Sequence, residues 1–499
     1  MNLKTKKITL LNIISNILLQ IITIISGFII PKLILENFGS EVNGLVASLN
    51  QFLSYITLLE GGITGVVMTA LYKPIVEKND EKISSIMNTS KSFFRKISII
   101  FVIYTLLLSF VYPLVFKTHF SFEYIMSLTW ILSIGLLIQY TYSINLRVLL
   151  NADKKVYIVS LVQASIIILN IILSIVVVNN FNSVHLLKIT SNLLFILQPI
   201  VYSIFVKKYF KLDNNAPQDK NLLKNRWNGF AINLAAFIHF STDVTILSIF
   251  TNLQIVSVYS VYALVTNGLR QFVIAVTNGI NPTIGQTYAS GNDSELNKKM
   301  DLYEYIILLV VFLLFTLAGI LITPFVMIYT SKIADANYYQ PLFGVLMVLS
   351  EALYLIKYPH LHLAYSANKY KEVTPSSYIE AFINIVISII LVNKYGIVGV
   401  AIGTTVAMLY KMIFHVYFST KIVKSRKQKD YYNKLLLFVI ATILGIYLCN
   451  LVPIELNYNI TNWLLCAIIY SIILIVIYII ISLLFFKKEI KQIFDYIKK

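Results

Sequence analysis

Long apolar runs, separated by short polar segments, extend along the whole chain. A helix of about 20 apolar residues crosses roughly 30 Å of hydrocarbon. Fourteen runs reach this length, with approximate bounds 8–30, 42–70, 97–116, 123–149, 156–179, 184–206, 228–250, 256–280, 304–329, 341–364, 373–392, 396–419, 435–452 and 462–485. The pattern therefore predicts an all-α integral membrane protein with about 14 transmembrane helices and short loops.

The composition fits this class and excludes an ordinary soluble domain. Of the 499 residues, 58% are hydrophobic and 13% are charged, whereas about a quarter of the residues in soluble domains are charged. The two cysteines, Cys449 and Cys466, lie in apolar runs. Their spacing matches no metal site, so we interpret both as small buried hydrophobic residues.

The net charge of +18 comes from loops on one side of the membrane. Thirty-three of the 41 lysines and arginines lie in the predicted cytoplasmic segments, five in the outward loops and three inside spans. This positive-inside pattern predicts an even number of spans with both termini in the cytoplasm. It also explains the basic charge without nucleic acid as a partner.

Two parts of the chain resemble each other. Residues 152–178 begin ADKK and end NIILSIVVV, and residues 367–392 begin ANKY and end NIVISIILV. A weaker similarity links NDEKI at 79–83 with NDSEL at 292–296. The tail of the first match keeps one offset, which pairs Asn170 with Asn384, Ser174 with Ser388, and Val178 with Val392.

The repeat divides the predicted helices into two sets of six. Because six is an even number, the second set enters the membrane from the same side as the first. Such parallel repeats, related by an axis along the membrane normal, occur in secondary transporters. We predict three parts: an N-lobe with helices 1–6 (1–212), a C-lobe with helices 7–12 (213–430), and two additional C-terminal helices with a basic cytoplasmic tail (431–499).

Three stretches resemble bacterial polysaccharide transporters of the Wzx type. They are PKLILENFGSEVNGLVASLNQFLSYITLLEGGI at 31–63, TDVTILSIFTNLQIVSVYSVYALV at 242–265 and YGIVGVAIGT at 395–404. Members of that family are flippases of lipid-linked oligosaccharide repeat units. They belong to the multidrug/oligosaccharidyl-lipid/polysaccharide (MOP) exporter superfamily. The resemblance covers about residues 1–425.

The resemblance implies a MATE-like fold with two six-helix lobes around a cavity that opens alternately to either side. It implies a flippase for undecaprenyl-pyrophosphate-linked oligosaccharides in the synthesis of O-antigen, capsule or exopolysaccharide. The expected location is the bacterial cytoplasmic (inner) membrane. Expected partners are membrane lipids, a polysaccharide polymerase and a chain-length regulator. No cofactor is expected, and coupling to H⁺ or Na⁺ stays open.

Seven charged residues lie well inside the predicted spans. A charge at the bilayer centre costs roughly 3 kcal/mol or more, so such residues face the interior of the helix bundle or water. They are four acids and three bases: Glu60, Asp243, Arg270, Glu351, Lys357, Glu380 and Lys411. A mixed set of charges suits an anionic headgroup better than it suits a cationic drug.

Arg270 and Asp243 lie on consecutive helices and are the first candidates for a site. The guanidinium of Arg270 suits pyrophosphate oxygens. Asp243 suits gating or cation coupling, and His239, one helical turn away, is a candidate proton partner. A structural alternative is that Asp243 and Arg270 form a buried pair that fixes helix register.

The other intramembrane charges admit both structural and functional readings. Glu351, Lys357, Glu380 and Lys411 lie close together in sequence in one lobe, which favours mutual pairing. Lys357 and Lys411 would still add positive potential to an anion-binding cavity, and Glu351 and Glu380 are candidates for coupling or gating. Glu60 precedes two glycines at an expected helix break, where transporters often place binding groups.

Two other functions remain open at this stage. One is a MATE-like cation-coupled small-molecule antiporter. The other is a membrane enzyme, a polysaccharide polymerase or glycosyltransferase acting on the same lipid. The outward loops are short and contain no paired carboxylates, and no P-loop, GxSxG or HExxH motif occurs. We therefore expect a transporter and not an enzyme, and we expect no metal site.

Overall fold

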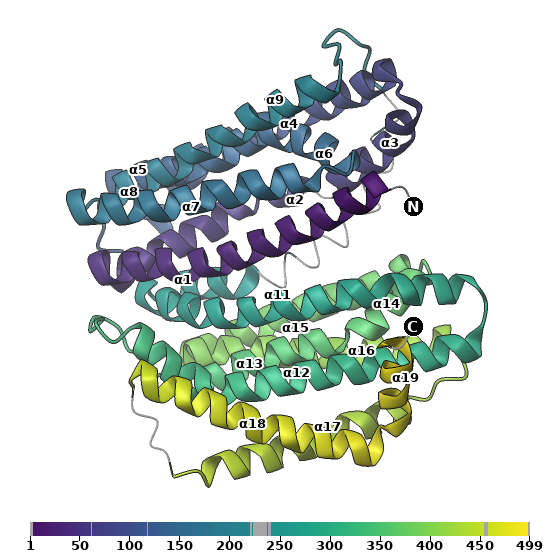
Figure 1. The fold of residues 1–499 in the computed structure, drawn as a ribbon. Helices are drawn as coiled ribbons and strands as arrows, with labels where there is room; N and C mark the ends of the chain where they lie inside the picture. The colour runs from purple at the N-terminus through teal and green to yellow at the C-terminus, as the bar shows by residue number, and fades with distance from the viewer. Residues whose placement is uncertain are drawn as a thin grey trace. The chain divides into compact units, whose positions relative to one another are not determined.

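The computed structural model describes residues 3–60, 62–116, 118–219, 222, 237, 241–453 and 458–497. Within these residues every regular element is a helix, and eleven helices are long and apolar enough to cross a membrane. The span predicted at 228–250 is described mainly in its second half, which forms the shorter apolar helix Ser241–Phe250. The all-helical, multi-pass prediction is confirmed, and the predicted count of about fourteen spans is consistent with these helices (Figure 1).

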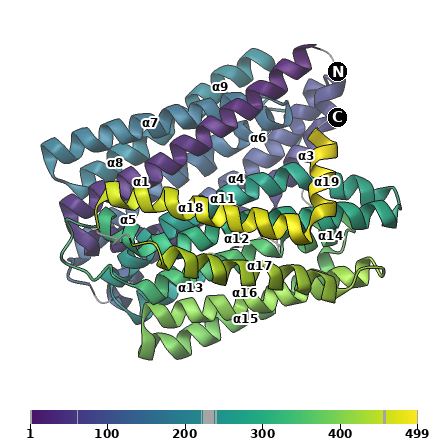
Figure 2. The same ribbon diagram turned by 60° about the horizontal axis from the view of Figure 1, so that its bottom comes forward.

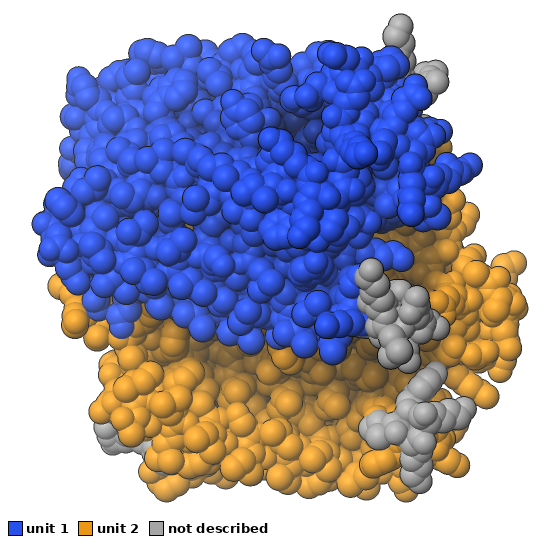
Figure 3. Space-filling view, turned by 45° about the horizontal axis from the view of Figure 1, so that its top comes forward, with its two compact units in different colours: residues 1–237, 252–257 blue, residues 238–251, 258–499 orange. Residues whose placement is uncertain are grey.

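The chain forms two compact units, which we describe separately (Figure 3). Unit 1 comprises residues 1–237 and 252–257, and unit 2 comprises residues 238–251 and 258–499. Unit 1 contains α1 (Leu3–Ser54), α2 (Thr57–Glu60), α3 (Ile63–Glu77), α4 (Asp80–Val115), α5 (Phe122–Ile138), the π-helix η1 (Gln139–Ser143), α6 (Ile144–Ala152), α7 (Val156–Phe181), α8 (Val184–Leu193), the 3₁₀ turn η2 (Leu194–Ile196) and α9 (Leu197–Tyr209).

Unit 2 contains the helix Ser241–Phe250 and nearly all of α11 (Leu253–Ala289). Its further elements are α12 (Asp293–Tyr329), α13 (Pro341–Ile356), α14 (Tyr358–Ser366), α15 (Tyr370–Tyr395), α16 (Ile397–Ile422), α17 (Gln428–Asn450), α18 (Ile460–Phe485) and α19 (Lys487–Ile497). The lobe boundaries predicted from the repeat stay a prediction.

The internal repeat is visible in the local geometry of both units. Asn79 and Asn292 cap α4 and α12 with nearly the same backbone angles, and each side chain accepts a hydrogen bond from the amide three residues later. The turns before α7 and α15 each contain a left-handed residue, Lys154 (φ 60°) and Asn368 (φ 54°). Matching sequences thus start matching helices, because the same cap and turn chemistry recurs.

Two glycines break the helices at the start of unit 1. Gly39 interrupts α1 with φ 83° and ψ 174°, so this element holds two helical segments in sequence. Gly62 has φ 83° and separates α2 from α3. Both backbone conformations are strained for residues with a Cβ atom, which is why glycine occupies them. The helix break expected next to Glu60 is therefore present.

Each unit has an apolar core and an apolar exterior. Leu45, Val67 and Phe101 of unit 1 have no exposed surface, and neither have Val400 and Phe438 of unit 2. Many large apolar side chains nevertheless remain exposed along α1, α4, α7, α17 and α18. A soluble protein rarely exposes apolar area of this extent, whereas a membrane helix presents such a surface to lipid.

Glycines bring α15 and α16 into close contact, and the two helices lie side by side in Figure 2. A Cβ atom on Gly403 would lie 2.2 Å from Ser388 Oγ, and one on Gly399 would lie 2.5 Å from the carbonyl oxygen of Leu391. Gly399 and Gly403 have the G-x-x-x-G spacing that lets membrane helices approach closely. Residue Thr404 is thereby held against α15.

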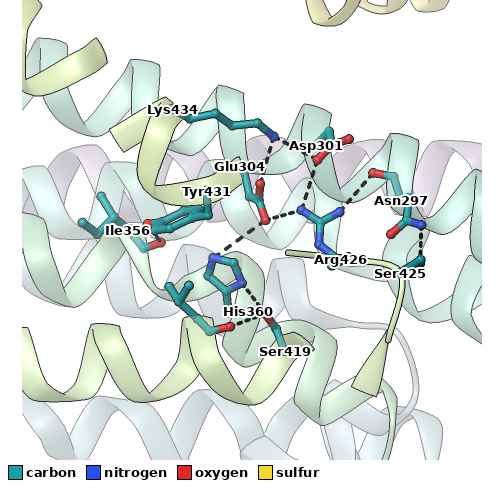
Figure 4. A network of polar contacts seen from close by, with 11 residues as sticks. Asn297, Asp301, Glu304, Ile356, His360, Ser419, Ser425, Arg426, Tyr431 and Lys434 are labelled. Atoms are coloured by element: carbon teal, nitrogen blue, oxygen red, sulfur yellow. Dashed lines mark hydrogen bonds and ion pairs between the residues drawn. The ribbon is translucent and has the colours of Figure 1, made fainter. Parts of the chain in front are cut away.

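The C-terminal helix pair is anchored to α12 by a buried ionic cluster (Figure 4). The Glu304 carboxylate is fully buried and accepts hydrogen bonds from Arg426 (2.6 Å) and Lys434 (3.0 Å). Asp301, which is partly exposed, lies 3.1 Å from Arg426 and 2.9 Å from Lys434. His360 Nε2 lies 3.8 Å from Glu304. The cluster joins α12, α14, the loop before α17, and α17 itself.

Further contacts extend this anchor along both C-terminal helices. The hydroxyl of Tyr478 in α18 lies 2.7 Å from that of Thr442 in α17 and 3.2 Å from that of Thr316 in α12. The indole of Trp463 donates to the carbonyl of Leu321 at 3.1 Å. Because unpaired polar groups are costly in hydrocarbon, these contacts fix α17 and α18 to α12 within unit 2.

We expect Glu304→Gln to destabilise the protein strongly. The substitution leaves two buried cations without their central counter-charge, and such losses cost about 3–5 kcal/mol. Asp301→Asn is the matched control and should cost about 1 kcal/mol or less, because this carboxylate is partly exposed. Thermal unfolding of the purified variants in detergent measures both, and equal midpoints for the two variants would contradict the central role of Glu304.

Gly403→Leu should also lower stability, because its side chain collides with Ser388 and forces α15 away from α16. Overpacking of this kind costs about 1–3 kcal/mol. Gly268→Ala is the control, since a Cβ atom at Gly268 meets no atom within 4 Å. The unfolding midpoint should fall for Gly403→Leu and stay within experimental error for Gly268→Ala. If the unfolding midpoint of Gly403→Leu equalled that of the wild type, the close contact between α15 and α16 would not contribute to stability.

Candidate functional site

Asp243 lies on the helix Ser241–Phe250 with 6% of its surface exposed. The hydroxyl of Thr404, from α16, lies 2.9 Å from each of its carboxylate oxygens. The hydroxyl of Tyr259, from α11, donates to Oδ2 at 3.2 Å. The amide of Asn384, from α15, lies 3.4 Å from Oδ1. Four helices of unit 2 therefore meet at this carboxylate.

The surroundings of Asp243 are rich in oxygen atoms. Thr404 Oγ1 also lies 3.3 Å from Asn384 Oδ1 and 3.2 Å from the Val400 carbonyl. The Ser388 hydroxyl lies 3.0 Å from Asn384 Oδ1 and 3.3 Å from the same carbonyl. The single proton of Thr404 can serve only one of the four oxygens within its reach, and Tyr259, Asn384 and Ser388 supply further donors to the cluster.

The donor set of this site has a clear chemical preference. One carboxylate, one amide oxygen, two hydroxyls and a backbone carbonyl are ligands of hard cations. No group of three or more His, Cys, Asp or Glu residues with metal-binding geometry occurs among the described residues, which gives no support to a transition-metal site there.

The internal repeat reproduces part of this frame in unit 1. Ser174 donates to Asn170 at 3.4 Å on α7, as Ser388 does to Asn384 on α15. Thr190, which has the same offset from Thr404, donates instead to the carbonyls of Leu186 and Leu187 at 2.9 and 3.0 Å. Both halves thus contain the Asn–Ser pair of the repeat. Among the described residues, only the threonine of unit 2, Thr404, contacts a carboxylate.

Arg270 lies on α11, eleven residues after Tyr259, and pairs with Glu351 of α13. Its Nη1 lies 2.7 Å from Glu351 Oε1, its Nη2 also contacts Asn267, and the side chains of the pair are 13% and 12% exposed. Glu351 Oε2 is buried without a hydrogen-bond partner among the described residues. The guanidinium therefore engages this carboxylate through one oxygen and not in the bidentate form that would use both.

Glu380 and Lys411 form a second buried pair, between α15 and α16. Their charged atoms lie 2.9 Å apart, and each side chain is 6% exposed. Lys411 also contacts Ser377. Lys357, at the junction of α13 and α14, places its ammonium 3.5 Å from the ring centre of Tyr354. This cation–π contact stabilises a buried ammonium in place of a direct carboxylate partner.

Glu60 lies apart from these residues, in unit 1. It accepts hydrogen bonds from the hydroxyls of Thr64 and, at 3.3 Å, Tyr140. His239 lies outside the described residues. The structure therefore places six of the predicted site residues in unit 2: Asp243 is hydrogen-bonded, Arg270 pairs with Glu351 and Lys411 with Glu380, and Lys357 makes a cation–π contact.

Sequence reasoning missed Thr404 and Tyr259 as neighbours of Asp243. It noted Asn384 and Ser388 as matching members of the repeat, without a role. The missed signal was available: Thr404 ends the glycine-spaced stretch YGIVGVAIGT, and glycine spacing marks the place where a second helix approaches. The partner helix and the carboxylate that it meets could not be read from that spacing.

Neither a protein-family model nor a curated protein sequence matches this chain. Solved structures do. The chain superposes on lipid II flippase MurJ in an inward closed conformation with a TM-score of 0.73 and 17% sequence identity, over 96% of this chain and 100% of that one.

Two transporter structures are similar over a smaller share of the chain. An inward-facing multidrug resistance MATE family transporter of the MOP superfamily has a TM-score of 0.64 and 14% identity, covering 81% of this chain and 96% of that one. The Vibrio cholerae MATE transporter VcmN in the bent form has a TM-score of 0.57 and 13% identity, covering 86% and 100%. The protein therefore has a fold like those of MurJ and the MATE transporters, and the predicted MATE-like fold is confirmed.

Proposed function

We propose that this protein is a flippase that moves a lipid-linked oligosaccharide across the membrane by alternating access. The substrate class is an undecaprenyl-pyrophosphate carrier with a short sugar headgroup, used for surface polysaccharide synthesis. Its polar headgroup would cross within the protein while the lipid tail stays in the bilayer. A multi-pass fold similar to MurJ supports this proposal at the level of architecture.

The observation that carries the proposal is the C-terminal helix pair. Similarity to lipid II flippase MurJ covers 96% of the chain, whereas similarity to the two MATE transporters covers 81% and 86%. In this protein α17 and α18 are fixed to α12 by the Glu304 cluster and the Tyr478 contacts. They are therefore an integral part of unit 2, which favours a flippase over an antiporter.

Arg270 is the group that we assign to the pyrophosphate. A guanidinium has five N–H donors, and its contacts with Glu351 and Asn267 use two of its nitrogens. Phosphate oxygens could compete with the Glu351 carboxylate for the N–H groups of the Arg270 guanidinium, because both are anionic hydrogen-bond acceptors. Lys357 and Lys411 add positive potential to this side of unit 2.

Asp243 is the group that we assign to coupling. Its oxygen-rich surroundings suit Na⁺ better than a soft metal. Binding of a cation there would draw together α15, α16 and the helix Ser241–Phe250, since each supplies an oxygen. A cation gradient could then bias the conformation of unit 2 without ATP, since a ligand shifts an equilibrium through its differential affinity for two states.

The first test is the sidedness of lipid-linked sugars in cells that lack this protein. We expect undecaprenyl-linked repeat units to accumulate on the cytoplasmic face. Repeat units that reach the outer face but stay unpolymerised would instead support an enzyme. Unchanged amount and sidedness would support a small-molecule antiporter, the second candidate, for which the MATE-like part of the fold is the supporting observation.

Asp243→Asn should abolish cation-dependent stabilisation, because it keeps the side-chain shape and removes the charge. Na⁺ at about ten times its dissociation constant would stabilise the wild type by about 1.4 kcal/mol. The measurement is the unfolding midpoint at constant ionic strength in Na⁺ against choline. Glu372→Gln, at an exposed carboxylate, is the control and should keep the full shift. An equal Na⁺ shift in Asp243→Asn would exclude this carboxylate as the cation site.

Arg270→Lys and Arg270→Ala should both reduce flipping, with the lysine variant intermediate. Lysine keeps the charge that pairs with Glu351 but loses the planar fork that suits phosphate. Complementation of the deletion strain, with protein levels measured in membranes, tests this order. Wild-type transport by Arg270→Ala at a normal protein level would remove Arg270 from the site.

A further inference from the structure

A cavity of about 600 Å³ is lined by residues of unit 1. Its walls come from the first part of α4, from η1 and α6, from α9, and from the segment that follows α9. By the distribution of lysine and arginine, this end of the helices faces the cytoplasm. None of its lining residues belongs to the site proposed above.

The segment after α9 is held in place by side chains of α4. The amide of Asn88 donates to the carbonyls of Asp213 and Ala216, each at 3.0 Å. The hydroxyl of Ser84 accepts a hydrogen bond from the Asp213 amide at 2.9 Å. Leu212 and Asn214, in the same segment, line the cavity. The wall is therefore ordered by hydrogen bonds.

The π-helix η1 shapes the opposite wall. Thr141 and Tyr142 from η1, and Asn145 from the next turn, line the cavity. Such π-helical turns are rare and often occur at functional sites. The amide of Asn145 donates to the Met87 carbonyl at 3.3 Å, while its Oδ1 is buried without a partner among the described residues. Asn145 is therefore held against α4 by this hydrogen bond, so η1 and α6 keep a fixed place in the cavity wall.

Two lysines give the cavity its charge. Lys91 of α4 and Lys207 of α9 line it, and neither forms an ion pair among the described residues. The lining contains no Asp or Glu. Both lysines are exposed, and two like charges that line one cavity create a positive potential that favours binding of an anion there.

The rest of the lining combines polar side chains with an apolar part, to which Met87, Leu146, Ile200, Ile204 and Leu212 contribute. Ile200 and Ile204 lie one turn apart on α9 and are 51% and 61% exposed, and Tyr142 is 62% exposed. These apolar side chains are therefore exposed and accessible, and they are not part of the buried core. A ligand that satisfies both surfaces has an anionic head and an apolar body, which a free phosphate ion lacks.

We propose that this cavity binds an anionic phospholipid of the cytoplasmic leaflet. The phosphate would lie between Lys91 and Lys207, and a hydroxylated headgroup such as glycerol would contact the polar lining residues, among them Ser203 and Asn214. The acyl chains would follow the exposed isoleucines of α9. Basic pockets between membrane helices on the cytoplasmic side are known to select anionic headgroups.

The test uses the full-length protein in neutral detergent, with phosphatidylglycerol as the probe. Phosphatidylcholine and inorganic phosphate are the comparison ligands, and binding is measured by native mass spectrometry and by the unfolding midpoint. We expect phosphatidylglycerol to bind and to raise the midpoint. Lys91→Gln or Lys207→Gln should each weaken binding about fivefold, and the double variant about thirtyfold.

Lys82→Gln is the matched control. Lys82 is an exposed lysine on the same helix, nine residues before Lys91 and therefore on the opposite face. Its substitution removes the same charge and should leave binding unchanged. Ile204→Ser should weaken phosphatidylglycerol binding and leave any phosphate binding unchanged, because it alters only the apolar wall.

Three outcomes would overturn the proposal. If Lys82→Gln lost as much phosphatidylglycerol affinity as the double variant, the binding would depend on the overall positive charge and not on this cavity. Equal binding of phosphatidylcholine would remove the role of the anionic headgroup. A stabilisation by inorganic phosphate as large as that by phosphatidylglycerol would assign the cavity to a soluble anion. Each result is independent of transport, so it can be distinguished from failure of the proposed flippase function.

Discussion

A charge in hydrocarbon must find its partner inside the protein, since no water is there to solvate it. Unit 2 meets this constraint with three kinds of contact. Ion pairs join Arg270 to Glu351 and Lys411 to Glu380. Hydroxyl and amide groups surround Asp243, and an aromatic ring faces Lys357. These contacts specify which helices pack against one another. Apolar side chains alone would allow several packing arrangements of the same helices.

The same constraint explains how the C-terminal helices join the rest. α17 and α18 have apolar exteriors and would associate with any apolar surface. The Glu304 carboxylate specifies their position, because it is fully buried and needs both Arg426 and Lys434. Buried ionic clusters of this kind contribute more to specificity than to net stability. In a transporter that alternates between states, such an anchor would make the helix pair move together with α12.

The two halves of the molecule share a frame but differ in what they hold. Both contain the Asn–Ser pair of the repeat and the same capped and left-handed turns. Unit 2 contains the hydrogen-bonded carboxylate of Asp243 and the buried ion pairs. Unit 1 contains the cavity lined by Lys91 and Lys207, which form no ion pair within the part of the chain that the structure describes. In our proposals the duplicated scaffold serves cation coupling in one half and lipid binding in the other.

The sequence by itself determined the all-helical class, most span positions, the repeat and the break near Glu60. These follow from local patterns, since length, hydropathy, cap residues and glycines act within a few residues of each other. The sequence also favoured pairing among the charges of helices ten to twelve. Only the tertiary structure decided that Arg270 pairs with Glu351, that Thr404 meets Asp243, and that Glu304 receives Arg426 and Lys434. These partners lie 81 to 161 residues apart. Their contact depends on how helices pack against one another, which no local pattern encodes.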